Sequence, residues 1–475
     1  MPLVVGVDSS TTACKVEVRD AESGALVASG RAPHPATAPP CSEQDPADWE
    51  SAFASACAQA GVSGAARPAA IACAAQQHGM VIVDAQGDVV RPAKLWNDTE
   101  SAVDAEELVK ELPGGAEGWA AGCGSVPVPS FTITKLRWLR RCEPDSFHRM
   151  GSVLLPHDWL TSRLTGERST DRGDASGTGY WSPSEGRYRL DLLAHIDDRV
   201  DWETALPTVL GPHDVAGVWP ATGALVGPGT GDNMAAALAL GLRPGDLVLS
   251  FGTSATACTV SERPSADASG AVAGFADATG RFLPLVCTLN AMKVTDTVAR
   301  LLGVHLAQFD RLALSAPPGA GGLVLVPHFD GERTPNRPDA TGVLSGIRSD
   351  ATPAQLARAA VEGVVCNLLD GADALPREAT GHGQRVFLIG GGAQSPAYRR
   401  VVADLTGRPV IVPAECELVA CGAALQAAAV LQHCSFEDLT AAWDVAVGEV
   451  VEPDDAVDRG AIRARYAAAA RGADR

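Results

Sequence analysis

Residues 3–16 read LVVGVDSSTTACKV, and residues 247–260 read LVLSFGTSATACTV. The two stretches align without a gap, and the identical pairs are Leu3 and Leu247, Val4 and Val248, Ser10 and Ser254, Thr12 and Thr256, Ala13 and Ala257, Cys14 and Cys258, and Val16 and Val260. Each is a β-rich run, a small polar turn and a second β-rich run, which predicts a hairpin. Because the repeat recurs after about half the chain, it predicts two related domains rather than a solenoid.

The turns of the two expected hairpins are rich in Gly, Ser and Thr. Backbone N–H groups and hydroxyls in such turns surround anions well. Two hairpins of this kind are suited to hold a polyphosphate between two lobes.

Length and composition agree with two domains. A chain of 475 residues exceeds what one hydrophobic core usually supports. We expect the domains to be residues 1–243 and 244–475, because a glycine-rich stretch at Gly241–Gly245 follows an alanine-rich helix. The formal net charge of −19 argues against nucleic acid or an anionic membrane as a partner.

The twelve cysteines form no C-x-x-C pair and no Cys/His group at zinc spacing. Cys14, Cys73, Cys258 and Cys287 lie in apolar runs and are expected to be small buried hydrophobes. No signal peptide and no bilayer-spanning apolar stretch is found, so we expect a soluble, cytoplasmic protein.

Strands and helices are expected to alternate in both halves. In the first half, Asp45 caps a helix with Pro46 at its first position and an apolar stripe of Trp49, Phe53 and Cys57. Other expected segments are a buried parallel strand at 69–75, loops or an insertion at 113–130, helices at 131–141 and from 156, strands around 281–289 and 322–327, a helix at 353–373 and a strand–turn–helix–strand unit from 385. This alternation predicts an α/β fold with sheets covered on both faces.

Asp8 ends the first strand, just before the polar turn Ser9–Thr12. A carboxylate there can hold hydrated Mg²⁺ beside phosphates while the turn supplies donors. The alternative is an ordinary Asx/Ser turn. The matching Gly252-Thr253-Ser254 in the repeat favours the functional interpretation.

Asp232 lies in GPGTGDNMAAAL, where a glycine run leads into a helix. A general base must be held rigidly near the group it deprotonates, and a helix start gives that rigidity. The alternative is a plain N-cap aspartate. The glycines are more than a cap needs, because they let backbone and substrate approach closely.

Two further patterns are weaker. Gly390-Gly391-Gly392 follows an apolar strand and could receive a flat base, although tight turns use glycine for steric reasons alone. Gln77 and His78 end a strand where a polyol could be bound, and Asp98 beside Trp96 either serves the same site or caps a turn.

The chain resembles the FGGY family of carbohydrate kinases, and within it the members that phosphorylate xylulose. The resemblance rests on GVDSSTTACK, SEQDPADW, AAQQHGM, LWND, PSFTITKLRWL, LLPHDWLTSRLTGE, TDRGDASGT, GTGDN, LSFGTSATA, PHFDGERTP and LIGGGAQS, which span the chain in the family's order. It implies two actin/ribonuclease H-like domains, related by duplication, with a cleft between them.

The resemblance also implies roles for single residues. Asp232 is the catalytic base, and Asp8 lies near Mg²⁺. The ketose is bound by Gln77, His78, Asp232 and Asn233. ATP is bound by a first phosphate motif (Ser9, Ser10, Thr11, Thr12), a second phosphate motif (Gly252, Thr253, Ser254) and an adenosine motif (Gly391, Gly392, Ala393).

Some positions depart from the commoner family pattern. Ser10 stands where glycine is frequent, and Ala13 also replaces a small flexible residue. Thr99-Glu100 follows LWND where many members carry an arginine, which bears on sugar specificity.

The expected activity is transfer of the γ-phosphoryl of ATP to a primary hydroxyl of D-xylulose, giving D-xylulose 5-phosphate. The alternatives are a kinase of the same family acting on ribulose, gluconate or glycerol, and an actin- or chaperone-like ATPase switch. The expected partners are the small ketose and ATP, with a homodimer as the candidate assembly and neither nucleic acid nor membrane.

Overall fold

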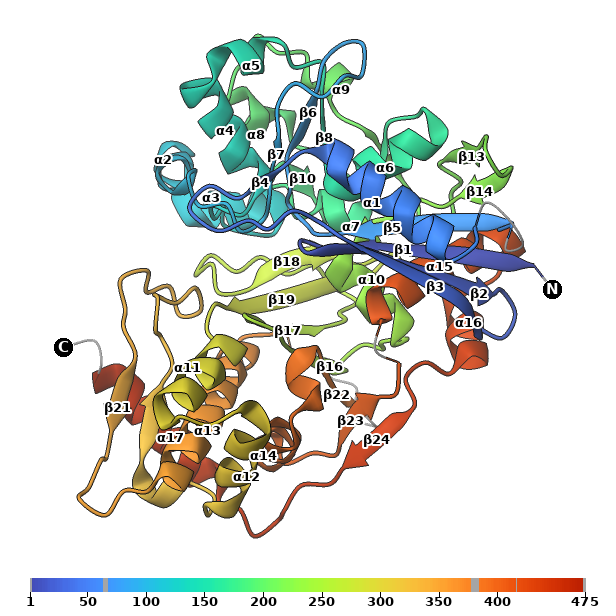
Figure 1. Ribbon diagram of the computed structural model, residues 1–475. Coiled ribbons are helices and arrows are strands. Elements are labelled where there is room, and N and C mark those ends of the chain that lie inside the picture. Colours follow the sequence, from blue (N-terminus) through green and yellow to red (C-terminus); the bar gives the residue numbers. More distant parts are fainter. Residues whose placement is uncertain (1, 63–66, 377–383, 416, 473–475) are drawn as a thin grey trace. The chain divides into compact units, whose positions relative to one another are not determined.

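Figure 1 shows the computed structural model, in which residues 2–62, 67–376, 384–415 and 417–472 are described. Two units follow from the internal contacts of the chain. The first unit comprises residues 1–242, 262–283 and 417–445, and the second comprises residues 243–261, 284–416 and 446–475. Each unit is built on its own mixed sheet.

The sheet of the first unit is organised around β1 (Leu3–Ser9). Its strand order is β13-β14-β5-β1-β2-β3, with β15 also paired to β5. The other strands are β2 (Ala13–Asp20), β3 (Leu26–Pro33), β5 (Ala70–Ala75), β13 (Gly217–Trp219), β14 (Ala224–Val226) and β15 (Thr230–Gly231). β1 pairs antiparallel with β2 and parallel with β5. The hairpin at 3–16 and the parallel strand at 69–75 are thereby confirmed.

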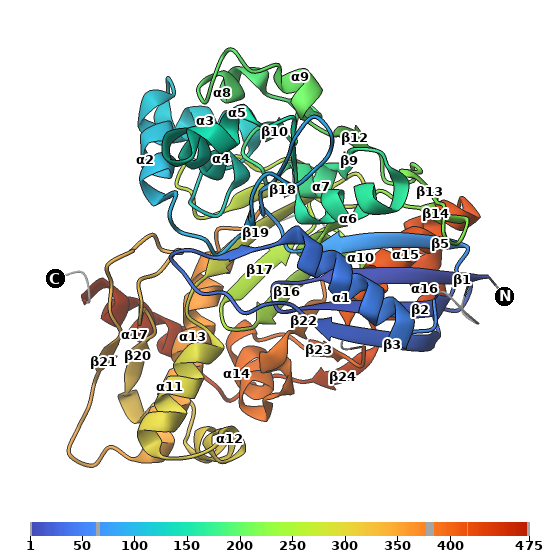
Figure 2. The same cartoon turned by 45° about the horizontal axis from the view of Figure 1, so that its top comes forward.

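Helices cover both faces of this sheet, as Figure 2 shows for α1 (Pro46–Gln59) and α15 (Leu418–Gln432). Val5 and Val7 of β1 belong to the core beneath α1. Gly6 points the other way, and a Cβ there would lie 1.9 Å from the carbonyl oxygen of Ala420. Glycine therefore allows α15 to pack directly on β1.

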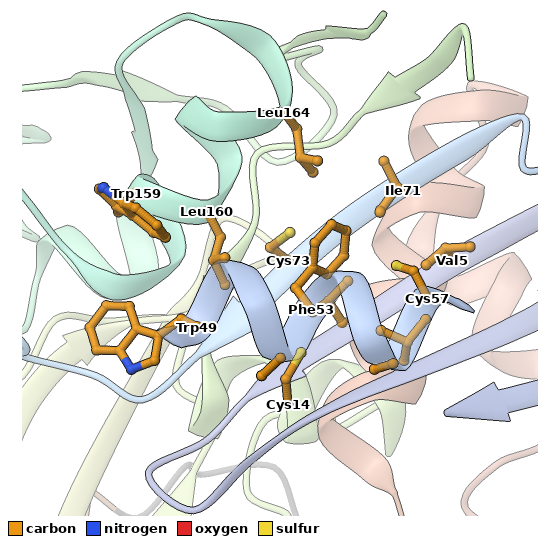
Figure 3. Close-up of a cluster of buried hydrophobic side chains, with 14 of the residues drawn as sticks. Val5, Cys14, Trp49, Phe53, Cys57, Ile71, Cys73, Trp159, Leu160 and Leu164 are labelled. Atoms are coloured by element: carbon orange, nitrogen blue, oxygen red, sulfur yellow. The ribbon is translucent and has the colours of Figure 1, made fainter. Parts of the chain in front are cut away.

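The helix α1 has the features that its sequence predicts. Asp45 caps it by accepting a hydrogen bond from the Ala47 N–H, and Pro46 is its first residue. Trp49, Phe53 and Cys57 are buried in a cluster with Ile71 and Cys73 of β5 and with Trp159, Leu160 and Leu164 of α6 (Pro156–Thr165) (Figure 3). The apolar stripe thus joins α1, α6 and the sheet in one core.

The sheet of the second unit repeats the central arrangement of the first. β16 (Leu247–Phe251) pairs antiparallel with β17 (Ala255–Thr259) and parallel with β22 (Val386–Ile389). β19 (Phe282–Thr288) lies beyond β17 and is followed by β18 (Ala273–Ala276), and β23 (Val410–Pro413) and β24 (Gly448–Val451) follow β22. The hairpin at 247–260 is confirmed, as is the strand expected around 281–289.

The second unit also contains α11 (Met292–Leu302), α12 (Leu306–Ser315), η1 (Ala320–Gly322), β20 (Val324–Val326), β21 (Val343–Ser345), α13 (Pro353–Ala372), η2 (Gly391–Gln394), α14 (Pro396–Thr406) and α17 (Arg459–Gly472). The helix expected at 353–373 and the unit from residue 385 are confirmed. Cys258 and Cys287 are buried, as are Cys14 and Cys73 of the first unit.

The remaining elements of the first unit are β4 (Glu43–Gln44), β6 (Val81–Val83), β7 (Ala93–Lys94), α2 (Ala102–Glu111), α3 (Gly115–Cys123), α4 (Thr132–Cys142), α5 (Pro144–His148), β8 (Ser152–Leu154), β9 (Ser169–Asp171), α7 (Arg172–Ala175), β10 (Trp181–Ser182), β11 (Arg187–Tyr188), α8 (Leu190–Ala194), α9 (Trp202–Ala205), β12 (Thr208–Leu210), α10 (Asp232–Ala239) and α16 (Phe436–Trp443).

One expected segment is wrong. Residues 113–130 were expected to form loops or an insertion, but residues 115–123 form the helix α3. Left-handed glycines, Gly114 and Gly124, flank it on both sides, and Trp119 and Cys123 share its buried face. The glycines delimit this helix rather than preventing it.

The α/β class with two related sheets is confirmed, whereas the cleft between the domains and their boundary at 243/244 remain predictions. Within the described residues, none of the helices combines the length and the apolar character that crossing a bilayer requires.

Candidate active site

The strands β1, β5 and β15 of the first sheet end side by side, and polar residues follow each of them. β5 is parallel to β1, with Ser9 opposite Ala75, and parallel to β15, with Gly231 opposite Ala75. The next residues along the chain are Ser10, Gln76 and Asp232. The topology therefore gathers three sequence-predicted motifs at one edge of the first unit.

Asp8 is buried and forms an ion pair that the sequence reasoning missed. Its Oδ2 lies 3.1 Å from Lys15 Nζ, and Lys15 Nζ also lies 2.6 Å from Glu417 Oε2. Burial raises the pKa of Asp8, and the charge of Lys15 offsets part of that rise. The hairpin register was the available signal, because it places Lys15 directly opposite Asp8.

The other carboxylate oxygen of Asp8, Oδ1, is buried without a hydrogen-bond partner. A buried anionic oxygen left unpaired is costly unless a cation or a donor approaches it. Carboxylate oxygens are the ligands that Mg²⁺ prefers. The Asp8 carboxylate is therefore chemically suited to be a metal ligand.

Residues 9–12, which were expected to bind phosphate, form the tip of the hairpin. The backbone N–H and the hydroxyl of Ser10 both donate to the Ala13 carbonyl, at 3.0 and 2.9 Å. Thr11 Oγ1 accepts from Trp96 Nε1 at 3.0 Å and donates to Gln76 Oε1 at 3.3 Å. Ser10, which replaces the more frequent glycine, thus closes the turn with its own side chain.

Asp232 is the first residue of α10, and Gly231 is the N-cap. The alternative of a plain N-cap aspartate is therefore not what the structure shows. Asp232 Oδ1 accepts hydrogen bonds from the backbone N–H and the Nδ2 of Asn233, at 2.8 and 2.9 Å. Burial and the negative charge of Asp8 raise the pKa of Asp232 to about 7. This value suits a general base at neutral pH.

Gln77 and Asn233 form an amide pair beside Asp232. Asn233 Nδ2 donates to Gln77 Oε1 at 2.9 Å. Gln77 Nε2 is buried and has no hydrogen-bond partner. An unpaired buried donor next to a candidate base is a group that a hydroxyl-rich ligand would satisfy.

His78 is held in a strained conformation with φ of 65°. Its Nδ1 lies 2.7 Å from the Gly177 carbonyl, so this nitrogen carries the hydrogen. Its ring packs against Phe131 and Phe275, with centroids 4.9 and 5.5 Å away. Thr132 Oγ1 donates to the His78 carbonyl at 3.2 Å. The imidazole therefore has a fixed orientation.

Asp98 stabilises a turn. Its Oδ2 accepts from the Ser42 N–H and from Lys94 Nζ, at 2.9 and 3.1 Å, and its Oδ1 accepts from the Glu100 N–H. Lys94 is fully buried and also pairs with Glu43 and Glu100. Glu100, which stands where many members have arginine, therefore neutralises a buried lysine.

The ligand atoms of Cys41, Glu43, Asp98 and Glu100 lie within 4.8 Å of one another. Lys94 Nζ contacts all three carboxylates of this group, so a cation of the protein itself already occupies the position between them. A second cation is not needed there.

The second unit brings its own predicted residues together. β16 and β22 are parallel, so the turn Gly252–Ser254 and the glycines 390–392 follow neighbouring strand ends. Gly252 accepts a hydrogen bond from the Met292 N–H, and Thr253 accepts one from the Ala291 N–H. A Cβ on Gly392 would lie 2.6 Å from Phe251 Cβ. Glycine is therefore needed for η2 to pack against β16, with Gly391 and Ala393 on either side.

Sequence models of two domains match this chain. The N-terminal domain of the FGGY family of carbohydrate kinases matches residues 3–238, and the C-terminal domain of that family matches residues 247–431.

Individual relatives match along nearly the whole chain. A xylulose kinase of Streptomyces coelicolor is 48% identical over 466 residues, which cover 96% of this chain and 93% of the relative. A xylulose kinase of Streptomyces rubiginosus is 47% identical over 458 residues, covering 95% and 92%. The crystal structure of xylulose kinase from Bifidobacterium adolescentis superposes with a TM-score of 0.86 at 41% identity, covering 99% of both chains. With both domains matched and close relatives along its length, the chain belongs to the FGGY family of carbohydrate kinases.

Proposed function

We propose that this protein phosphorylates D-xylulose with ATP at a primary hydroxyl and releases D-xylulose 5-phosphate and ADP. The substrate assignment rests on the xylulose kinases that are 47–48% identical over most of the chain. The observation that carries the chemistry is Asp232, a half-buried carboxylate held by Asn233 where the strands of the first sheet end.

Asp232 accepts the proton of the sugar hydroxyl as that oxygen attacks the γ-phosphorus. The new O–P bond forms, the bond to the bridging oxygen of ADP breaks, and the proton stays on the carboxyl of Asp232. Because the pKa of Asp232 is about 7, most molecules carry it as a carboxylate at slightly alkaline pH. That carboxylate can accept the proton of the sugar hydroxyl. Gln77, through its unpaired Nε2, and the immobilised His78 orient the ketose.

Asp8 would hold Mg²⁺ through its unpaired Oδ1, and the metal would offset negative charge on the phosphates. Lys15 adds a fixed positive charge on the same side of the hairpin. The backbone of Gly252–Ser254 would bind phosphate oxygens, and Gly391, Gly392 and Ala393 would receive adenosine. We place the reaction in the cytoplasm, and a homodimer remains the candidate assembly.

ADP release with D-xylulose, D-ribulose, L-ribulose, gluconate and glycerol tests the assignment. D-xylulose is expected to give the highest kcat/KM, and product analysis is expected to show the 5-phosphate. A higher kcat/KM with another acceptor overturns the assignment of D-xylulose as the substrate. ATP hydrolysis at the same rate with and without every acceptor overturns the kinase activity and favours an ATPase switch.

A further inference from the structure

The turn that delivers Asp232 is held from both sides. Gly229 has φ of 77°. Gln426 of α15 clamps its peptide groups, since Gln426 Oε1 accepts from the Gly229 N–H at 2.9 Å and Gln426 Nε2 donates to the Gly229 carbonyl at 3.0 Å. A Cβ on Gly229 would lie 2.6 Å from His157 Cδ2, so the imidazole forms the opposite wall.

Thr230 connects this turn to a buried aspartate. Its Oγ1 donates to Asp171 Oδ2 at 2.7 Å. The same carboxylate caps α7, because Oδ2 accepts from the Gly173 N–H at 2.9 Å and Oδ1 accepts from the Asp174 N–H at 2.8 Å. Asp171 thus fixes the turn before Asp232 and the start of α7 with one side chain.

His157 lies among three buried aspartates, Asp158, Asp171 and Asp174. Its Nδ1 lies 2.8 Å from Asp174 Oδ2, and its Nε2 lies 3.1 Å from Asp158 Oδ1. Nδ1 forms a hydrogen bond with Asp174, whereas the Nε2 contact with Asp158 is an ion pair without hydrogen-bond geometry. Burial alone would lower the pKa of His157, but the carboxylates of Asp158, Asp174 and Asp171 raise it.

The helix that carries His157 is itself anchored. Trp159, Leu160 and Leu164 of α6 are buried with Trp49 and Phe53 in the core of the first unit (Figure 3). A displacement of His157 would therefore require repacking of that core. The packing of this apolar cluster therefore also fixes the position of His157.

We propose that Thr230, Asp171, Asp174 and His157 form a positioning group that holds the turn before Asp232, so that the base reaches the substrate hydroxyl in one orientation. This inference rests on the proposed function of Asp232. None of the four residues is assigned a contact with substrate. Their expected contribution is to kcat, with little effect on the binding of either substrate.

The test compares three variants at two buried threonines, Thr230 and Thr161. Thr230→Val keeps the shape and removes the bond to Asp171, and it is expected to lower kcat about 10- to 100-fold with both KM values within about twofold. Thr230→Ser keeps the hydroxyl and is expected to restore kcat to within about threefold of the wild type. Thr161→Val on α6 is the matched control, because Thr161 Oγ1 is also buried but has no hydrogen-bond partner.

Asp171→Asn is the second arm and does not depend on the stability of the Thr230 variants. The amide keeps an oxygen to cap α7 but offers only one acceptor, so kcat is expected to fall while the melting temperature changes little. Unchanged kcat in both Thr230→Val and Asp171→Asn overturns the proposal. An equal rise of both KM values with a lowered melting temperature also overturns it, since that pattern indicates general damage.

Asp232→Asn, measured in parallel, separates this inference from the proposed function. If Asp232→Asn retains turnover, the base assignment fails and the positioning role fails with it. If Asp232→Asn is inactive and Thr230→Val is fully active, only the positioning role fails.

Discussion

The two sheets share a framework but end in different chemistry. In both, a hairpin strand has an antiparallel partner on one side and a parallel partner on the other: β2 and β5 for β1, and β17 and β22 for β16. At the offset of the repeat, Asp8 corresponds to Gly252 and Lys15 to Thr259. The ion pair of the first hairpin thus has no counterpart in the second.

The residues after the parallel partner strand differ in the same way. β5 is followed by Gln76, Gln77 and His78, whereas β22 is followed by glycines 390–392. The strand ends of the first sheet, the first edge, present the side chains of Gln77, His78 and Asp232, which we propose to bind the sugar and accept its proton. The second edge presents backbone, which binds anions and flat surfaces without adding charge. The two sheets therefore share their central strand pairing and differ in the residues that follow the strands.

Asp232→Asn is expected to give the largest effect. If proton transfer depends on the first edge, kcat is expected to fall about 10²- to 10⁴-fold. The KM values for ketose and ATP are expected to stay close to those of the wild type, because Asn retains an oxygen for Asn233. Steady-state kinetics of ADP formation measures both. A kcat within threefold of the wild type would show that Asp232 only begins α10.

Asp8→Asn is expected to give the next largest effect. It removes one charge from the oxygen pair that contains the unpaired Oδ1, so the Mg²⁺ concentration for half-maximal rate is expected to rise about tenfold or more. Titration of activity with Mg²⁺ at saturating ATP measures this. Glu417→Gln is the control, because it also contacts Lys15 but is not the proposed ligand. Equal shifts in both variants would assign the effect to Lys15 instead.

The two edges are distinguished most directly by a pair of binding-site variants. His78→Ala removes the fixed imidazole and is expected to raise the KM for the ketose about tenfold while the KM for ATP stays within twofold. Gly392→Ala introduces a Cβ 2.6 Å from Phe251 Cβ and is expected to do the reverse. Parallel changes of both KM values in both variants would contradict a division of binding between the edges.

The sequence predicted the frame of both edges because hairpins, buried strands and glycine turns are local patterns. It also predicted α1 through Asp45, Pro46 and its apolar stripe. It missed α3, because glycines inside and beside a short helix resemble a loop until Trp119 is seen to be buried. Propensity favours the loop, and tertiary packing overrides it.

The site was predicted less completely, and the reason is distance along the chain. Asp8, Gln77 and Asp232 stand out by their positions at strand or helix ends. The bond between Thr230 and Asp171 joins residues 59 positions apart, and the clamp of Gly229 by Gln426 joins residues 197 apart. Local sequence patterns do not predict contacts between residues so far apart in the chain. Lys15 is the exception, since the hairpin register alone places it opposite Asp8.

The smallest expected effect concerns the free-energy cost of ionising the half-buried carboxylate of Asp232. The pKa of Asp232 is raised to about 7 from 3.8, so the folded state binds its proton more tightly than the unfolded state. The protein therefore loses stability as pH rises from about 4 to about 7, and the loss persists above pH 7. Asp232→Asn removes this penalty and is expected to stabilise the protein at pH 8 by about 1 kcal/mol, because solvent at the half-buried carboxylate screens much of the effect, with no gain at pH 4.

Urea unfolding of wild type and Asp232→Asn at both pH values measures this difference, provided that the transition is reversible. Asp191→Asn is the matched control, because bonding to Arg189 lowers the pKa of Asp191 and gives the opposite sign. That variant is expected to lose stability slightly at pH 8. A destabilised Asp232→Asn protein at pH 8 would mean that the surroundings stabilise the ionised carboxylate. Asp232 would then not have the raised pKa that the proposed general base requires.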